Sequence, residues 1–247
     1  CLYTVHLVCN TINGVIYFWP RSIPPDQSRL SSEDVLSYNT ALSQQLLTEI
    51  GWVDHDNNPQ TPLQAWGVPN IPSGTPFSVT LLTDQSGFHQ ALSEIVQTSL
   101  NQCGFEVAIT QLPASDLYAP GPSGPLFGRA FDLTLLSWMP MPDVDCRYYM
   151  SSLVPNTANN WIGTNIAGLM DEGYDAACST ASLSLPAEQA DALQQSELIF
   201  LNSLPAVPLF SVPSVMVLSG EICSDGSFSG ETFFQTLEGL SLVTDCQ

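Results

Sequence analysis

The sequence predicts an α/β fold, and three hydrophobic patterns carry that prediction. Residues 75–109 have the pattern of a strand, a helix and a second strand, which normally closes as a right-handed parallel crossover. Residues 131–138 form an apolar run typical of a buried strand. The remaining pattern consists of two helical segments followed by two short β-prone runs, at residues 167–179, 186–204, 207–210 and 215–218. Strands that alternate with helices along a chain indicate one α/β domain.

The strand–helix–strand unit is recognised by a change of hydrophobic period. Its strands show alternating apolar residues, at Phe77, Val79 and Leu81 and again at Phe105, Val107 and Ile109. A helix is predicted over residues 86–102, and Gly104 ends it. The side of this helix that we expect to be buried carries Phe88, Ala91, Leu92, Ile95 and Val96.

An earlier helix is predicted over residues 39–50, with Asn39 as its N-cap and Gly51 after its end. We expect its buried side to carry Ala41, Leu42, Leu46, Leu47 and Ile50.

The turn after this helix carries three polar residues at alternate positions. Asp54, Asp56 and Asn58 have the spacing of a calcium loop. Pro59 stands where such a loop needs glycine, and no glutamate closes it. A polar turn is therefore the favoured interpretation, and a calcium site is the alternative.

The stretch from residue 131 to residue 152 is the candidate site. Its apolar run ends at Trp138, an irregular Pro/Met turn follows over residues 139–142, and Asp143 and Asp145 come next. A buried strand that delivers an aromatic ring and carboxylates to one place is typical of a ligand site. A core strand with a solvated acidic turn is the alternative. Pro- and Gly-rich residues 116–128 and Asn-rich residues 150–164 are predicted to be loops.

The charge balance excludes several classes of function. The chain has 247 residues, with 24 acidic residues against four arginines and no lysine, and a formal net charge of -20. Such a chain repels phosphate backbones, so we expect no nucleic-acid partner. Without lysine there is no P-loop lysine and no Schiff base. No apolar run is long enough for a membrane-spanning helix.

Seven cysteines are scattered along the chain without CxxC or zinc spacing, at positions 1, 9, 103, 146, 178, 223 and 246. They predict an exported protein with at least one disulfide, and buried free thiols are the alternative. The sequence leaves the pairing open. Cys1 has the residue type of a lipoprotein's first residue, but the apolar segment after it favours a chain that begins in mid-protein.

Four segments in order resemble the C-terminal lobe of the family 5 extracytoplasmic solute-binding proteins of ABC importers, the oligopeptide- and dipeptide-binding type. These segments are YNTALSQQLLTEIGWVDHDN, ALSEIVQTSLNQCGFEVAI, FDLTLLSWMPMPD and QQSELIFLNSLPAVPLFSV. The resemblance implies a periplasmic-binding-protein-like lobe of type II, with a mixed sheet flanked by helices. Residues 1–247 are then a single lobe of a two-lobed protein, with residues 1–30 and 221–247 as hinge or other-lobe segments.

The resemblance also implies a set of ligand-binding residues. The family's ligand strand offers main-chain groups at its end, which correspond here to Ser137, Trp138 and Met139. Met141 stands where peptide binders place the aspartate that receives the ligand ammonium group, and Leu135 stands where the oligopeptide type has an arginine.

Three further residues complete the candidate set: Asp143 and Asp145 as substitute anions, and Asn160 as the match to a frequent asparagine of the following loop. Because both charged anchors are missing, ordinary peptide specificity is not expected.

The function implied is capture of a peptide or related small solute between two lobes, with no catalytic residue, metal or cofactor. The implied partners are the N-terminal lobe of the same chain and an ABC permease. The implied location is extracytoplasmic, either periplasmic or anchored as a lipoprotein at the outer face of the cell membrane.

Two other classes remain as alternatives. One is a secreted hydrolase that uses Asp143 and Asp145 as an acid/base pair. The other is an extracellular structural or adhesion module. Serine hydrolysis finds no support, since there is no GxSxG motif and His6, His55 and His89 lie in ordinary contexts. His89 falls within a helix pattern, where a surface or half-buried residue is expected.

Overall fold

The computed structural model describes residues 14–18, 39–137, 145–184, 186–209, 222–224 and 240–242. The chain divides into two compact units, residues 1–210 and residues 211–247. In the second unit, strands β8 (Ile222–Ser224) and β9 (Leu240–Leu242) pair in antiparallel fashion.

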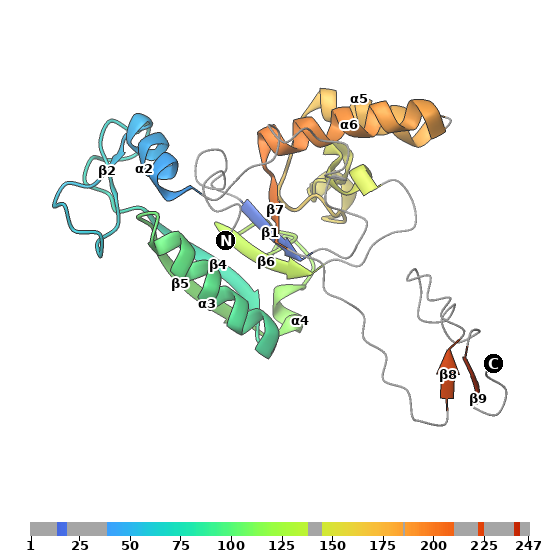
Figure 1. Ribbon diagram of the computed structural model, residues 1–247, viewed down its shortest axis with the longest axis horizontal. Coiled ribbons are helices and arrows are strands. Elements are labelled where there is room, and N and C mark those ends of the chain that lie inside the picture. The colour runs from blue at the N-terminus through green and yellow to red at the C-terminus, as the bar shows by residue number, and fades with distance from the viewer. Residues whose placement is uncertain are drawn as a thin grey trace. The chain divides into compact units, whose positions relative to one another are not determined.

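The first unit is built on a five-stranded sheet with the order β5-β4-β6-β1-β7 (Figure 1). Its strands are β1 (Gly14–Phe18), β4 (Ser78–Asp84), β5 (Glu106–Leu112), β6 (Leu133–Ser137) and β7 (Ala206–Pro208). Every described pair in this sheet is parallel. The α/β class is therefore confirmed, while the antiparallel member that a mixed sheet requires is not among the described strands. The run at residues 215–218 lies outside the described residues.

The strand–helix–strand prediction is confirmed as β4, α3 (Gly87–Asn101) and β5. Ser86 caps α3, because its side chain accepts a hydrogen bond from the backbone N–H of His89 at 3.2 Å. Gly104 follows with a φ of 91°, and an added Cβ there would lie 2.5 Å from the Leu63 side chain. Glycine therefore meets both the backbone and the packing requirement at this turn.

The buried face of α3 differs from the predicted one. Phe88 and Ile95 are 48% and 56% exposed. The buried positions recur at intervals of three and four residues and are His89, Leu92, Ser93, Val96, Ser99 and Leu100. The expectation for Phe88, Ala91 and Ile95 was wrong because small and hydrogen-bonded polar residues occupy the inner face.

Helix α2 (Thr40–Glu49) begins at the predicted cap, where the Asn39 side chain accepts from the Leu42 N–H at 3.0 Å. Its buried residues are Ser43 and Leu47, whereas Leu42 and Ile50 are 44% and 45% exposed and Ala41 is also exposed. The predicted buried side is thus correct only at Leu47, with Leu46 half-buried. Strands β2 (Trp52–Val53) and β3 (Gln64–Ala65) form a short antiparallel hairpin after it.

The segment between β2 and β3 is the polar turn. The Asp54 side chain accepts from the Asp56 N–H, the Asp56 side chain from the Asn58 N–H, and the Asn58 side chain from the Gln60 N–H, all at 3.0 to 3.1 Å. These side chains accept hydrogen bonds from backbone N–H groups within their own turn. Within the described part of the chain, no group of three or more His, Cys, Asp or Glu side chains is arranged to hold a metal ion.

Two hydrophobic clusters pack on opposite faces of the sheet. Successive strand residues point to opposite sides, so Leu81 and Leu135 enter one cluster while Leu82 and Leu136 enter the other. The first cluster includes Leu92, Val96 and Leu100 of α3 and a stack of Trp52, Phe77 and Phe105 with ring centroids 4.0 and 4.2 Å apart. The second includes Leu117, Tyr148, Tyr149, Tyr174, Cys178 and Phe200.

The second cluster is covered by α5 (Glu172–Leu183) and α6 (Pro186–Ser203), which lie side by side (Figure 1). Helix α5 begins later than predicted, because the Asp171 side chain caps it by accepting from the Tyr174 N–H at 2.8 Å. The connecting segments hold the short elements α4 (Ala114–Leu117), η2 (Asp145–Tyr149), η3 (Ser151–Leu153) and η4 (Thr157–Asn159). None of the described helices has the length and apolar character needed to cross a membrane.

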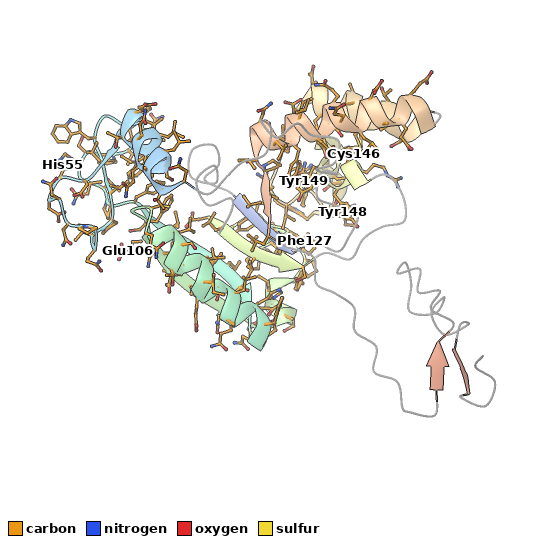
Figure 2. The ribbon with its side chains drawn as sticks, in the orientation of Figure 1. His55, Glu106, Phe127, Cys146, Tyr148 and Tyr149 are labelled. Atoms are coloured by element: carbon orange, nitrogen blue, oxygen red, sulfur yellow. A yellow bond between two sulfur atoms is a disulfide. The ribbon has the colours of Figure 1, made fainter. Side chains whose placement is uncertain are left out.

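A disulfide joins Cys146 of η2 to Cys178 of α5, with an S–S distance of 2.07 Å. Figure 2 places Cys146, Tyr148 and Tyr149 on one segment beside α5 and α6. The prediction of at least one disulfide is confirmed. Cys103 is a buried free thiol, and burial raises its pKa. Cysteines 1, 9 and 246 lie outside the described residues.

Candidate functional site

The candidate site lies at the edge of the sheet where β4 and β6 end. Parallel strands bring their carboxyl ends to the same edge, which is the usual ligand-binding edge of an open α/β sheet. Strand β4 ends at Asp84 and strand β6 ends at Ser137. Helix α3 begins directly after β4, so its first turn lies at the same edge.

Asp84, His89 and Ser137 form one hydrogen-bonded chain at this edge. The His89 Nδ1 atom lies 2.6 Å from the Asp84 Oδ2 atom, and the His89 Nε2 atom lies 2.9 Å from the Ser137 Oγ atom. Ser137 points toward α3 because it shares the strand face of Leu135, whose cluster includes α3. His89 is 6% exposed, whereas Ser137 is exposed. The three hydrogen-bonded groups are therefore a mostly buried carboxylate, a buried imidazole ring and the hydroxyl of an exposed serine.

The donors and acceptors in this chain follow from the chemistry of its groups. An ionised carboxylate only accepts, so His89 Nδ1–H donates to Asp84. In the neutral imidazole the Nε2 atom then carries the lone pair and accepts from the Ser137 hydroxyl. Asp84 thus fixes the tautomer of His89, and His89 fixes the direction of the Ser137 O–H bond.

The Asp84 carboxylate is stabilised in its charged form. Burial alone raises its pKa, but hydrogen bonds from Ser86 and His89 outweigh burial, so the pKa of Asp84 lies below its ordinary value of 3.8. The backbone N–H of Ser86 donates to the other carboxylate oxygen at 2.8 Å. Burial, and after it the negative charge of Asp84, raise the pKa of the Tyr118 phenol.

The sequence prediction for His89 was wrong, since His89 is buried and bonded at both ring nitrogens. Its partners are separated from it by 5 and 48 positions in the sequence, so helical periodicity carries no signal for Ser137. A local signal did exist, because a strand that ends in Asp84 is followed by the Ser86 cap and by His89 in the first helical turn. His55, by contrast, is exposed beside the Trp66 ring.

Of the predicted site residues, Ser137 is described in full and is the last residue of β6. Trp138, Met139, Met141 and Asp143 lie outside the described residues. Asp145 is the first residue of η2, and only its backbone is described.

Asn160 is exposed in the left-handed region, with a φ of 55°, at the end of η4. Among the described contacts, no hydrogen bond joins Asn160 to Ser137. Leu135, at the family's arginine position, is fully buried.

The asparagine that organises the loop after η4 is Asn165, which sequence reasoning missed. Asn165 is fully buried, and its amide nitrogen donates to the carbonyl oxygens of Tyr149, Met150 and Leu169 at 2.8 to 3.1 Å. Its amide oxygen accepts from the N–H groups of Gly168 and Leu169 at 3.0 Å. Nothing in the sequence separates Asn165 from the other asparagines of this segment.

The sequence matches no protein-family model and no curated protein. Solved structures do share its fold. The oligopeptide-binding protein AppA from Bacillus subtilis, in complex with a nonapeptide, is 22% identical with a TM-score of 0.53, over 68% of this chain and 31% of that one.

NikZ from Campylobacter jejuni, in complex with Ni(L-His), is 17% identical with a TM-score of 0.56, over 76% of this chain and 35% of that one. A periplasmic oligopeptide-binding protein from Thermotoga maritima, bound to mannohexaose, is 16% identical with a TM-score of 0.53, over 74% of this chain and 33% of that one. The chain therefore has the periplasmic-binding-protein fold, as predicted, and spans about a third of the length of these proteins.

Proposed function

We infer that this chain is the C-terminal lobe of an extracytoplasmic solute-binding receptor of an ABC importer. The observation that carries the proposal is the shared fold, which extends over 68% to 76% of the chain in proteins that bind a nonapeptide, Ni(L-His) or mannohexaose. The order of elements, with β6 ending at Ser137 on the carboxyl edge, is the second support. In this proposal residues 221–247 belong to the hinge or the other lobe, while residues 14–18 are a strand of this lobe's own sheet.

The proposed mechanism is closure of two lobes around the solute. A ligand that contacts both lobes favours the closed state by its differential affinity for that state. The ABC permease then recognises the closed form. No catalytic step, metal or cofactor is part of this mechanism. Because the structural relatives are binding proteins, they favour this reading over the hydrolase based on Asp143 and Asp145 and over an adhesion module.

The location proposed is the outer side of the cell membrane. The Cys146–Cys178 disulfide supports an oxidising compartment. The strongly acidic, lysine-free composition is compatible with an exported receptor that meets a membrane permease rather than nucleic acid.

The ligand class proposed is a neutral, apolar or cationic solute. A buried ligand carboxylate needs a fixed cation, yet the chain has only four arginines, and Leu135 replaces an arginine at the family position. The residues proposed for ligand contact are Ser137, Trp138, Met139, Met141, Asp143, Asp145 and Asn160. Met141 offers a polarizable thioether rather than an anion, so a free ligand ammonium group gains little there.

The test is calorimetric titration of the two-lobed protein with an oligopeptide, its N-acetylated form, an oligosaccharide and Ni(L-His). We expect micromolar or tighter binding of at least one solute and poor discrimination between the peptide and its N-acetylated form. The chain alone should bind at least a hundredfold more weakly, because one lobe provides about half of the contact area. Failure of the two-lobed protein to bind any of the four solutes contradicts the receptor proposal.

A further inference from the structure

The Asp84–His89–Ser137 chain has an arrangement that ligand binding alone does not require. Its three groups stand in the order carboxylate, imidazole and hydroxyl, with heavy-atom separations of 2.6 and 2.9 Å. The 2.9 Å between His89 Nε2 and Ser137 Oγ falls within the range in which a base takes a proton from a nucleophile, and the 2.6 Å between Asp84 and His89 Nδ1 is the hydrogen bond that orients the base. The same order of groups activates the serine of many hydrolases built on unrelated folds.

The surroundings of the three groups suit nucleophilic chemistry. Asp84 stays ionised because hydrogen bonds from Ser86 and His89 stabilise its charge. His89 is 6% exposed, so water competes little for its Nε2 atom. Ser137 is exposed at the end of β6, so a carbonyl carbon can approach its Oγ atom from the carboxyl edge.

We propose that Ser137 is a nucleophile activated by His89 and Asp84, and that it accepts the acyl group of activated esters. This proposal does not rest on the receptor function. It assigns Ser137 as the residue that forms the covalent bond, His89 as its base, and Asp84 as the residue that positions His89.

The proposed reaction has two steps. In the first, the Ser137 Oγ atom attacks the ester carbonyl carbon, its proton passes to His89 Nε2, and the bond between the acyl carbon and the leaving oxygen breaks. The leaving group departs with the proton that Nε2 releases, and an acyl–Oγ ester remains. In the second step, water attacks this ester, Nε2 takes the water proton and returns it to Oγ, and the carboxylic acid is released.

The composition of the protein simplifies an acyl-labelling experiment, because few other side chains compete for the label. The chain contains no lysine, so side-chain amines do not compete for the acyl group. It also carries an internal control, because Ser115 is an exposed serine whose Oγ atom donates to the Asp116 carboxylate at 3.1 Å rather than to an imidazole. Both serines meet the same reagent in the same tube.

The experiment treats the chain with p-nitrophenyl acetate at neutral pH and follows p-nitrophenolate release together with peptide mass mapping. We expect acetylation of Ser137 at least tenfold faster than that of Ser115. Ser137→Ala should abolish the site-specific release, and Ser115→Ala should leave it unchanged.

Asp84→Asn tests the role of the carboxylate. An amide N–H presented to His89 Nδ1 favours the tautomer with hydrogen on Nε2, which cannot take the serine proton. We expect Ser137 acetylation in Asp84→Asn to fall by about a hundredfold, within the range of general-base catalysis. His89→Ala removes a buried ring and can disturb folding, so His89→Gln is used in its place. Asp84→Asn and His89→Gln are compared with the wild type only after circular dichroism shows that they have the same fold.

Three results overturn the proposal. One is acetylation of Ser137 no faster than that of Ser115. Another is an adduct that maps to His89 instead of Ser137. The last is a wild-type rate of Ser137 acetylation in folded Asp84→Asn. None of these results bears on the receptor proposal, which is tested by solute binding to the two-lobed protein.

Discussion

The Asn165 amide nitrogen lies 2.8 Å from the carbonyl oxygen of Tyr149, so a fully buried side chain ties the loop after η4 to the end of η2. The same segment, η2, carries Cys146 of the disulfide. A hydrogen bond and a disulfide therefore connect η2, which follows the candidate site in the sequence, to α5 and to the loop that precedes α5.

Replacing Asn165 by alanine should lower the free energy of unfolding by about 3 kcal/mol, because buried carbonyl and N–H groups lose their partners. Chemical denaturation with urea measures the change. Asn160→Gly is the matched control, since Asn160 is exposed and in the left-handed region that glycine readily adopts. Its effect should stay within about 0.5 kcal/mol. Equal effects of the two substitutions contradict the assignment of Asn165 as the organising residue.

Replacing both Cys146 and Cys178 by serine should lower the free energy of unfolding by about 3 to 4 kcal/mol. The disulfide joins residues 32 positions apart, and opening a loop of this size raises the entropy of the unfolded chain by a corresponding amount. Urea denaturation with and without reductant measures the change in the wild type. Peptide mapping of unreduced, alkylated protein should show the linked Cys146 and Cys178 peptides, and alkylation of both thiols in oxidised protein contradicts the pairing.

The Asp84 carboxylate should make stability depend on pH. Its folded pKa lies below the ordinary value of 3.8, so its ionised form stabilises the folded protein above pH 3.8. That contribution is lost as the pH falls through the folded pKa. Asp84→Asn should therefore be less stable than the wild type at pH 7, with a difference that shrinks below pH 3.8. A difference in unfolding free energy that stays constant from pH 7 to pH 3 disagrees with this assignment.

The buried face of α3 can be tested with two neighbouring substitutions. Leu92 is 8% exposed and packs in the first cluster, whereas Ile95 is 56% exposed. Leu92→Ala should cost about 3 kcal/mol, while Ile95→Ala should cost less than about 1 kcal/mol. Thermal or urea denaturation of the two variants gives both values. Similar costs for the two substitutions support the face that the hydrophobic pattern predicts, because both residues lie on that face.

Local features of the fold could be predicted from the sequence, while the inner faces of its helices could not. Asn39 caps the helix that it is predicted to cap, and Gly104 follows the end of α3 as predicted, because caps and left-handed turns depend on a few neighbouring atoms. Phe88 and Ile95 were placed inside by hydrophobicity alone. Which side of a helix faces the sheet is decided by contacts between distant segments.

The candidate site shows the same division. The sequence points to Ser137 because the apolar strand that carries it resembles the ligand strand of a known family of binding proteins. His89 was set aside because its role depends on Ser137, which approaches it only through the pairing of β4 with β6. A buried polar residue becomes intelligible when its partners are known, and those partners are not local in the sequence.

The pairing of β1 with β6 has a consequence for synthesis of the protein on the ribosome. Residues 14–18 of β1 take their places beside residues 133–137 of β6 and residues 206–208 of β7. The growing chain therefore cannot close this half of the sheet until its last described long helix has been made. Contacts between such distant segments slow folding and leave strand edges open in the nascent chain. The β4–α3–β5 unit, whose strands are neighbours in both sequence and sheet, can assemble much earlier and offer β4 as a template for β6.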